Sequence, residues 1–145
     1  QATHATSDKN MAEDRLGPVR IQGAYAWRKL LDSGARIANG SDFPVEHPNP
    51  FYGLHASVTR QDQQSNPAGG WYGEERMTLE EALASFTIDA AYAGHQEAHL
   101  GTLEPGKKAD FILLDRDIFT QPPTQMWQTQ VQETWVDGVR VSVQN

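Results

Sequence analysis

The dipeptide Asp137-Gly138 constrains the fold of this chain more than any other short feature of its sequence. It separates two runs with alternating apolar residues, Val131 to Val136 and Val139 to Val143. Asp-Gly between two such runs is typical of a type I′ β-hairpin, because both central residues of that turn need a positive φ. The sequence therefore predicts an antiparallel hairpin near its C-terminal end.

Another strand is expected at residues 109–115, where a compact apolar run follows the turn Glu104-Pro105-Gly106-Lys107. Three strands with open edges cannot make a sheet that is covered on both faces. We therefore expect this sheet to pair with something else, either a second copy of the chain or a segment that belongs to a longer polypeptide.

Nearer the N-terminus the apolar residues recur at helical spacing. Residues 1–20 are polar and predict a loop with room for one helical turn at residues 10–15. Residues 19–31 predict a helix that stops at Ser33-Gly34. Thr78 and Glu81 have the spacing of a capping box, which predicts the start of a further helix. The change from helical to alternating period divides the chain near residue 100.

The carboxylate of Asp42 follows a short predicted strand at residues 36–39. Enzymes with α/β folds hold catalytic groups at the carboxyl ends of strands. The residues Ser41-Asp42-Phe43-Pro44 are also typical of an ordinary turn. By itself, this motif leaves both the catalytic and the structural interpretation open.

Composition excludes several classes of function. The 145 residues carry a net charge of −7 and include no cysteine, so a thiolate metal site and a cysteine nucleophile are ruled out. Basic residues are scattered, which argues against nucleic acid and anionic membranes as partners, and no apolar run reaches the roughly 18 residues of a membrane helix. A cytoplasmic location is expected, with a secreted or periplasmic one left open. The chain begins with Gln1, and neither its helical part nor its β part has enough predicted elements for a complete domain. We therefore expect a C-terminal piece of a longer protein.

Several motifs occur together and in a fixed order along nearly the whole chain. They are Gln1-Ala2-Thr3-His4-Ala5-Thr6-Ser7-Asp8, Arg15-Leu16-Gly17, Gly23-Ala24-Tyr25-Ala26-Trp27-Arg28, Gly40-Ser41-Asp42-Phe43-Pro44-Val45-Glu46, Asn49-Pro50, Gly53-Leu54, Val58-Thr59-Arg60, Gly70-Trp71, Thr78-Leu79-Glu80-Glu81-Ala82-Leu83, Gly101-Thr102-Leu103 and Pro105-Gly106-Lys107-Lys108-Ala109-Asp110-Phe111. In this order they resemble the C-terminal region of the YtcJ-like branch of the metal-dependent amidohydrolases (amidohydrolase family 3, which includes N-substituted formamide deformylases).

The resemblance implies an α/β fold. Residues 1–100 would be the final strands and helices of a (β/α)8 metal-dependent hydrolase barrel, and residues 101–145 would be the C-terminal strands of a small β-sandwich. It also implies a hydrolase for non-peptide C–N bonds, in particular amides, with a divalent metal, most often zinc, as cofactor and a small-molecule amide as substrate. A deaminase of the same superfamily, or a non-catalytic interaction module, are the alternatives.

By this resemblance Asp42 ends the eighth barrel strand, contacts the metal and shuttles the proton of the attacking water. His4 matches a histidine that lies near the metal or the substrate, although Ala2 replaces the usual proline; it could also be a simple loop histidine. The family's His-x-His pair and its other ligands are absent from this chain. Because a catalytic zinc site needs about three protein ligands, we expect the isolated chain to be inactive.

Two further residues are candidates for substrate binding. Arg60 has a planar guanidinium that fits a substrate carboxylate, or it could pair with a backbone carbonyl at the end of a helix. Trp71 stands in a glycine-rich loop, where it could form a wall of the substrate pocket or could pack within the loop.

Overall fold

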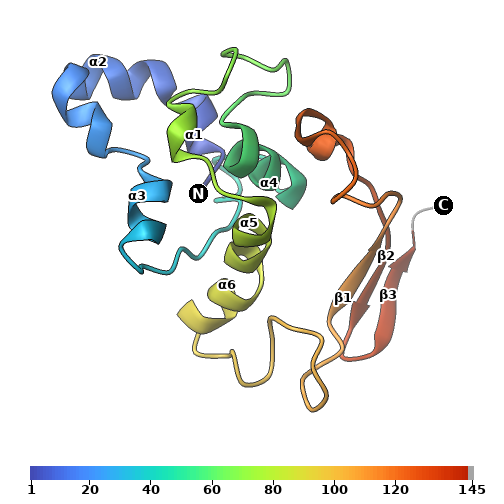
Figure 1. The fold of residues 1–145 in the computed structure, drawn as a ribbon. Helices are drawn as coiled ribbons and strands as arrows, with labels where there is room; N and C mark the ends of the chain where they lie inside the picture. The colour runs from blue at the N-terminus through green and yellow to red at the C-terminus, as the bar shows by residue number, and fades with distance from the viewer. Residues whose placement is uncertain (144–145) are drawn as a thin grey trace.

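The computed structural model describes residues 1–143, which form a group of helices beside a three-stranded sheet (Figure 1). Their helical and strand segments follow in chain order. They are α1 (His4–Ser7), α2 (Lys9–Arg20), the 3₁₀ turn η1 (Ile21–Gly23), α3 (Trp27–Asp32), α4 (Pro50–Thr59), the 3₁₀ turn η2 (Gly73–Glu75), α5 (Leu79–Phe86), α6 (Ile88–Ala93), β1 (Phe111–Leu114), the 3₁₀ turn η3 (Pro123–Gln128), β2 (Val131–Val136) and β3 (Val139–Val143). Across these residues, no helix has both the length and the apolar character needed to cross a membrane.

Helix α4 is the central element of the helical part. It begins where the Asn49 side chain accepts a hydrogen bond from the Phe51 backbone N–H at 2.9 Å, with a proline in the first turn. Its apolar face is buried. Gly53 lets α5 approach closely, since a Cβ atom at this position would lie 2.4 Å from the Phe86 ring. The fit between α4 and α5 therefore depends on the absence of a side chain at Gly53.

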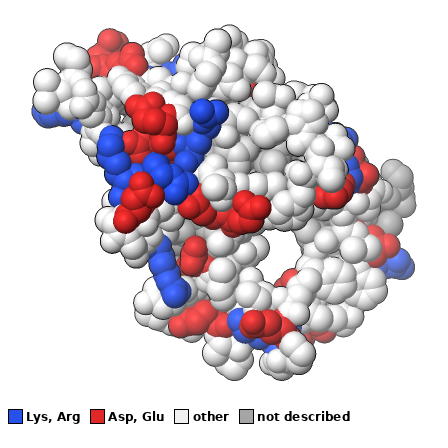
Figure 2. Space-filling view, viewed as in Figure 1, with Lys and Arg blue, Asp and Glu red and all other residues white. Residues whose placement is uncertain are grey.

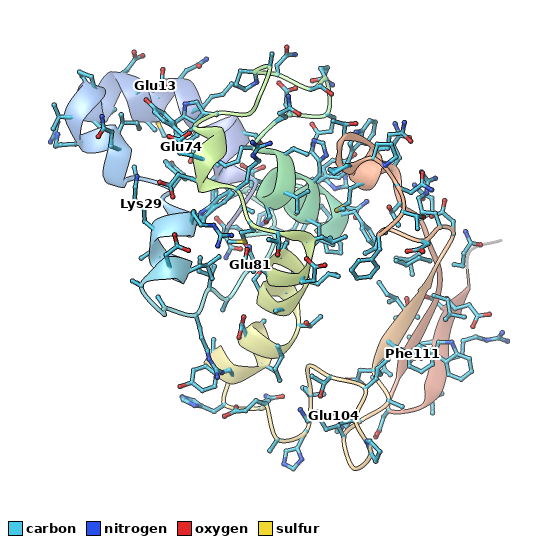
Figure 3. All side chains as sticks on the ribbon, in the orientation of Figure 1. Glu13, Lys29, Glu74, Glu81, Glu104 and Phe111 are labelled. Atoms are coloured by element: carbon cyan, nitrogen blue, oxygen red, sulfur yellow. The ribbon has the colours of Figure 1, made fainter. Side chains whose placement is uncertain are left out.

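The predicted capping box is present at the start of α5. The Glu81 backbone N–H donates to the Thr78 hydroxyl at 3.2 Å, and the Glu81 carboxylate accepts from the Thr78 backbone N–H at 2.7 Å. Glu81 also pairs with Arg28 of α3, and in Figure 3 its side chain lies between the two helices. One residue thus begins α5 and ties it to α3.

The predicted hairpin is confirmed. Strands β2 and β3 are antiparallel and are joined by Asp137 and Gly138, whose φ angles are +52° and +75°. Positive φ at both turn positions is what a type I′ turn requires. Strand β1 falls within the predicted 109–115 segment and pairs with β2, and Phe111 stacks on Trp135 with ring centroids 5.4 Å apart. The sheet order is β1-β2-β3.

The predicted helix at residues 19–31 is wrong in its limits. Residues 1–20, expected to be a loop with one helical turn at residues 10–15, form the longer helical segments α1 and α2. The expected helix is interrupted between η1 and α3, where Tyr25 has a φ of +52°. The Tyr25 carbonyl accepts a hydrogen bond from Arg60 at 2.8 Å. Arg60 and Tyr25 are 35 residues apart in the sequence. The positive φ of Tyr25 therefore accompanies a distant contact, which helical periodicity does not predict.

The strand expected at residues 36–39 is not formed as a ladder within the described residues. The segment is held by other contacts. The Asn39 backbone N–H donates to the Ser85 carbonyl of α5 at 2.8 Å, and the Asn39 side chain accepts from the Ala2 backbone N–H at 3.0 Å. A strand needs a neighbouring strand for its hydrogen bonds, and among residues 1–143 the neighbours of this segment are a helix and the N-terminal turn.

A groove of about 530 Å³ separates the helices from the sheet, and Figure 2 shows the opening. Phe86 and Ala91 line it from the helices, and Phe111 lines it from β1, where Figure 3 labels it. The fold is mixed α/β, as expected. The assignment of its two parts to a barrel and a sandwich stays a prediction, and residues 144–145 of the predicted second part lie outside the described residues.

Candidate functional site

His4 and Asp42 lie in contact, although 38 residues separate them in the sequence. His4 Nε2 is 3.0 Å from Asp42 Oδ2. The imidazole is mostly buried, whereas the carboxylate is about half exposed. The Ala2–Asn39 hydrogen bond positions them together, because it ties the residues just before α1 to the segment that leads into Asp42. The structure thus brings together Asp42, for which the resemblance implied a metal contact, and His4, for which it implied a place near the metal or the substrate.

A tight turn presents the Asp42 side chain. Asp42 has a φ of +56°, in the left-handed region, and its carbonyl accepts hydrogen bonds from the backbone N–H groups of Val45 at 2.8 Å and Glu46 at 3.3 Å. The Ser41 hydroxyl accepts from the Phe43 N–H at 3.3 Å. A non-glycine residue in this conformation is uncommon, and aspartate adopts it more readily than most other residue types.

Two carboxylates face the other nitrogen of the His4 ring. His4 Nδ1 is 3.4 Å from Asp8 Oδ2 and 3.5 Å from Glu46 Oε1. Glu46 is held in turn by the Ser7 hydroxyl, which donates to it at 2.5 Å. The imidazole therefore lies between Asp42 on one side and two acidic side chains on the other, an arrangement that fixes the direction of its Nε2 atom.

The donor atoms of His4 and Asp42 are suited to a divalent metal. Ligand atoms around a tetrahedral zinc lie roughly 3.3–3.6 Å apart, given metal–ligand distances of roughly 2.0–2.2 Å, so the Nε2–Oδ2 separation of 3.0 Å would widen slightly around the metal. Imidazole and carboxylate are both zinc ligands. Residues 1–143 contain no group of three histidine or acidic side chains placed to bind a metal. This chain thus supplies two suitable donors and not a complete set.

Arg60 lies away from this site, in the core of the helical part. It is fully buried, and its Nε and Nη1 atoms donate to the carbonyls of Trp71 at 2.6 Å and Tyr25 at 2.8 Å. Burial lowers the pKa of Arg60 to about 10, although the nearby carboxylates of Glu75 and Glu74 partly offset this shift. The side chain remains charged at neutral pH. Its contacts favour the interpretation of Arg60 as an arginine that pairs with backbone carbonyls over that of a substrate-binding residue.

Trp71 is part of the same core. The residue is 6% exposed, and its Nε1–H donates to Glu13 Oε1 at 2.7 Å. The Arg60 guanidinium carbon lies 5.1 Å from the Trp71 ring centroid and 4.4 Å from that of Trp27. The two rings cover the buried charge, so the structure favours packing over a pocket wall for Trp71.

The sequence indicated no role at this site for Tyr25, Glu46 or Asp8, the last of which fits an ordinary loop cap. Tyr25 donates its hydroxyl to Asp8 Oδ2 at 3.2 Å. Burial, and then the charge of Asp8, raise the pKa of Tyr25 above its usual value. All three residues lie inside the motifs quoted above. Their roles depend on contacts between motifs, which the order of the motifs along the chain does not show.

Comparison with known proteins gives a consistent assignment. The model of the amidohydrolase family matches residues 1–142. The chain is 30% identical to the putative amidohydrolase YtcJ of Bacillus subtilis over 138 residues, which is 95% of this chain and 26% of that protein. It is 33% identical to the N-substituted formamide deformylase of Arthrobacter pascens, with 77% and 20% covered. A solved structure of an uncharacterized metal-dependent hydrolase from Pyrococcus furiosus superposes with a TM-score of 0.63 at 32% identity, with 79% and 22% covered.

This chain belongs to the amidohydrolase family. It spans about a quarter or less of the length of these relatives.

Proposed function

We propose that this chain is the C-terminal part of a metal-dependent hydrolase that cleaves non-peptide C–N bonds, in particular amides of small molecules. The contact between His4 Nε2 and Asp42 Oδ2 carries this proposal, because it places a metal-type nitrogen donor beside a half-exposed carboxylate. The similarity to an N-substituted formamide deformylase supports an amide as the substrate.

In this proposal Asp42 transfers a proton. Its carboxylate takes a proton from the attacking water and passes it to the nitrogen that leaves the acyl carbon. His4, the more buried of the two residues, holds the Asp42 carboxylate in place through its Nε2 atom. A divalent metal, zinc by preference, held by Asp42, His4 and ligands from other parts of the polypeptide, would supply activation of the water by lowering its pKa towards ~7.

The isolated 145-residue chain is expected to be inactive, because it supplies two of the roughly three protein ligands that a catalytic zinc needs. The longer polypeptide from the natural reading frame is therefore the right protein for the test. A frame without ligands upstream, and a product without hydrolytic activity, would favour the alternative of a non-catalytic module.

The test is the substitution Asp42→Asn in that polypeptide, with Asp14→Asn on the exposed surface of α2 as control. We expect Asp42→Asn to lower kcat for N-substituted formamides by about 10²–10⁴-fold, as loss of a general acid–base group does, and Asp14→Asn to leave it unchanged. Product analysis distinguishes formate release from ammonia release, which would indicate the alternative of a deaminase. Full activity of the Asp42→Asn protein would refute the proposed role.

A further inference from the structure

The core of the helical part fixes the position of Tyr25. The carbonyl of Tyr25 accepts from Arg60 at 2.8 Å, and its ring packs edge-on against Trp71 with centroids 5.3 Å apart. Its φ of +52° turns the chain between η1 and α3. Backbone and ring are therefore both held by buried groups, which leaves the phenol little freedom.

From this fixed position the Tyr25 hydroxyl reaches the surroundings of His4. It donates to Asp8 Oδ2 at 3.2 Å, and the same oxygen lies 3.4 Å from His4 Nδ1. The opposite ring nitrogen of His4 is the one in contact with Asp42. A continuous series of contacts thus joins Tyr25, Asp8, His4 and Asp42.

We propose that Tyr25 is a positioning residue, whose hydroxyl fixes the Asp8 carboxylate and thereby directs the His4 imidazole toward Asp42. This inference rests on the proposed function of Asp42. It explains how residues of the buried core set the orientation of the His4 ring beside Asp42. Arg60 and Trp71, which the sequence suggested as substrate contacts, act on the site through Tyr25.

The chemistry of the phenol suits this role. An aspartate side chain that is about one third exposed samples several rotamers unless a donor holds it, and Tyr25 supplies such a donor. Burial, and then the charge of Asp8, keep the pKa of Tyr25 raised, so the hydroxyl keeps its proton at neutral pH. Outer residues of this kind typically affect metal affinity or activity by 10–100-fold.

Tyr25→Phe in the natural polypeptide removes the hydroxyl and keeps the ring. Tyr72→Phe is a matched control, because the Tyr72 ring also packs edge-on against Trp71, with centroids 5.0 Å apart. The first measurement follows the His4 ring signals by NMR of ¹³C,¹⁵N-histidine-labelled protein, assigned by their loss in His4→Asn. We expect Tyr25→Phe and Asp8→Asn to shift these signals and Tyr72→Phe to leave them in place.

The second measurement is activity. Tyr25→Phe is expected to lower kcat about tenfold with KM changed by less than about twofold, and the double variant with Asp8→Asn is expected to lose no more than Asp8→Asn alone. Unchanged His4 signals in Tyr25→Phe, or equal losses of kcat in Tyr25→Phe and Tyr72→Phe, would overturn the inference. Shifted His4 signals in Tyr25→Phe together with full activity of Asp42→Asn would keep the positioning role and refute the proposed function.

Discussion

The helical part and the sheet bury their apolar side chains to very different extents. Phe51, Leu54 and Ala82 in the helices are at most 4% exposed, whereas Ile112 of β1 and Val139 of β3 are 42% and 64% exposed. The helices enclose a core of aromatic rings around a buried arginine. The sheet is held by its own ladder hydrogen bonds and by one stacked aromatic pair, and it meets the core through the partly buried side chains of Leu114 and Val131. Internal packing thus stabilises the helices, while the sheet offers apolar surface for further pairing.

Among the variants that test this difference between helices and sheet, Arg60→Met is expected to cause the largest loss of stability. The substitution leaves the Trp71 carbonyl without its donor, at a cost of about 1–3 kcal/mol. It also removes the charged donor to the Tyr25 carbonyl, which keeps a hydrogen bond from the Trp27 backbone N–H at 3.1 Å. We expect a loss of about 3 kcal/mol in the free energy of unfolding, measured with urea. Arg60→Lys keeps the charge without the planar donor geometry and should restore only part of this loss. Arg15→Met, on the exposed surface of α2, is the control, and an equal effect of the two methionine variants would contradict the role of the buried arginine.

A smaller effect is expected from Glu81→Gln, which tests the contact between α3 and α5. Glutamine still suits a capping box, so the variant mainly removes the charge that pairs with Arg28, worth about 0.5–1 kcal/mol for a partly exposed pair. The hydrogen bond from Arg28 lowers the pKa of Glu81 below its ordinary 4.5.

The pH dependence of the Glu81 contact follows from that direction. A carboxylate with a lowered folded-state pKa stabilises the protein above its unfolded-state pKa, and this stability is lost as the pH falls through the folded-state value. The difference in unfolding free energy between native protein and Glu81→Gln should therefore be full at pH 7 and shrink below pH 4.5. A difference that stays constant from pH 7 to pH 3 would show that the ion pair contributes nothing.

The smallest effect on stability is expected from Val141→Thr in β3. Val141 is 58% exposed, so the change in unfolding free energy should stay below about 0.5 kcal/mol. The same variant should weaken self-association of the chain, measured by sedimentation, because β3 is an edge strand and its apolar side chains favour pairing. A sedimentation profile identical to that of the unchanged chain would remove the support for pairing through this strand.

Local sequence determined the parts of the fold that need only neighbouring residues. The Asp137-Gly138 hairpin and the Thr78–Glu81 capping box form as predicted, because each depends on the φ preference or the side-chain reach of a few adjacent residues. The order of the motifs likewise sufficed for the family. The family resemblance also suggested a metal role for Asp42 and a place near the metal or the substrate for His4, although nothing in their spacing fixes a 3.0 Å contact.

The tertiary structure decided what depends on groups distant in the sequence. Tyr25 leaves the predicted helix at a point where Arg60 binds its carbonyl, and Arg60 itself lies buried between Trp27 and Trp71. Residues 36–39 bond to a helix where a strand was expected. Periodicity reports which side chains prefer burial, but it does not report which partner satisfies a buried carbonyl or charge. That choice is made only when the whole chain packs, because an unpaired buried polar group costs more than a local conformational preference provides.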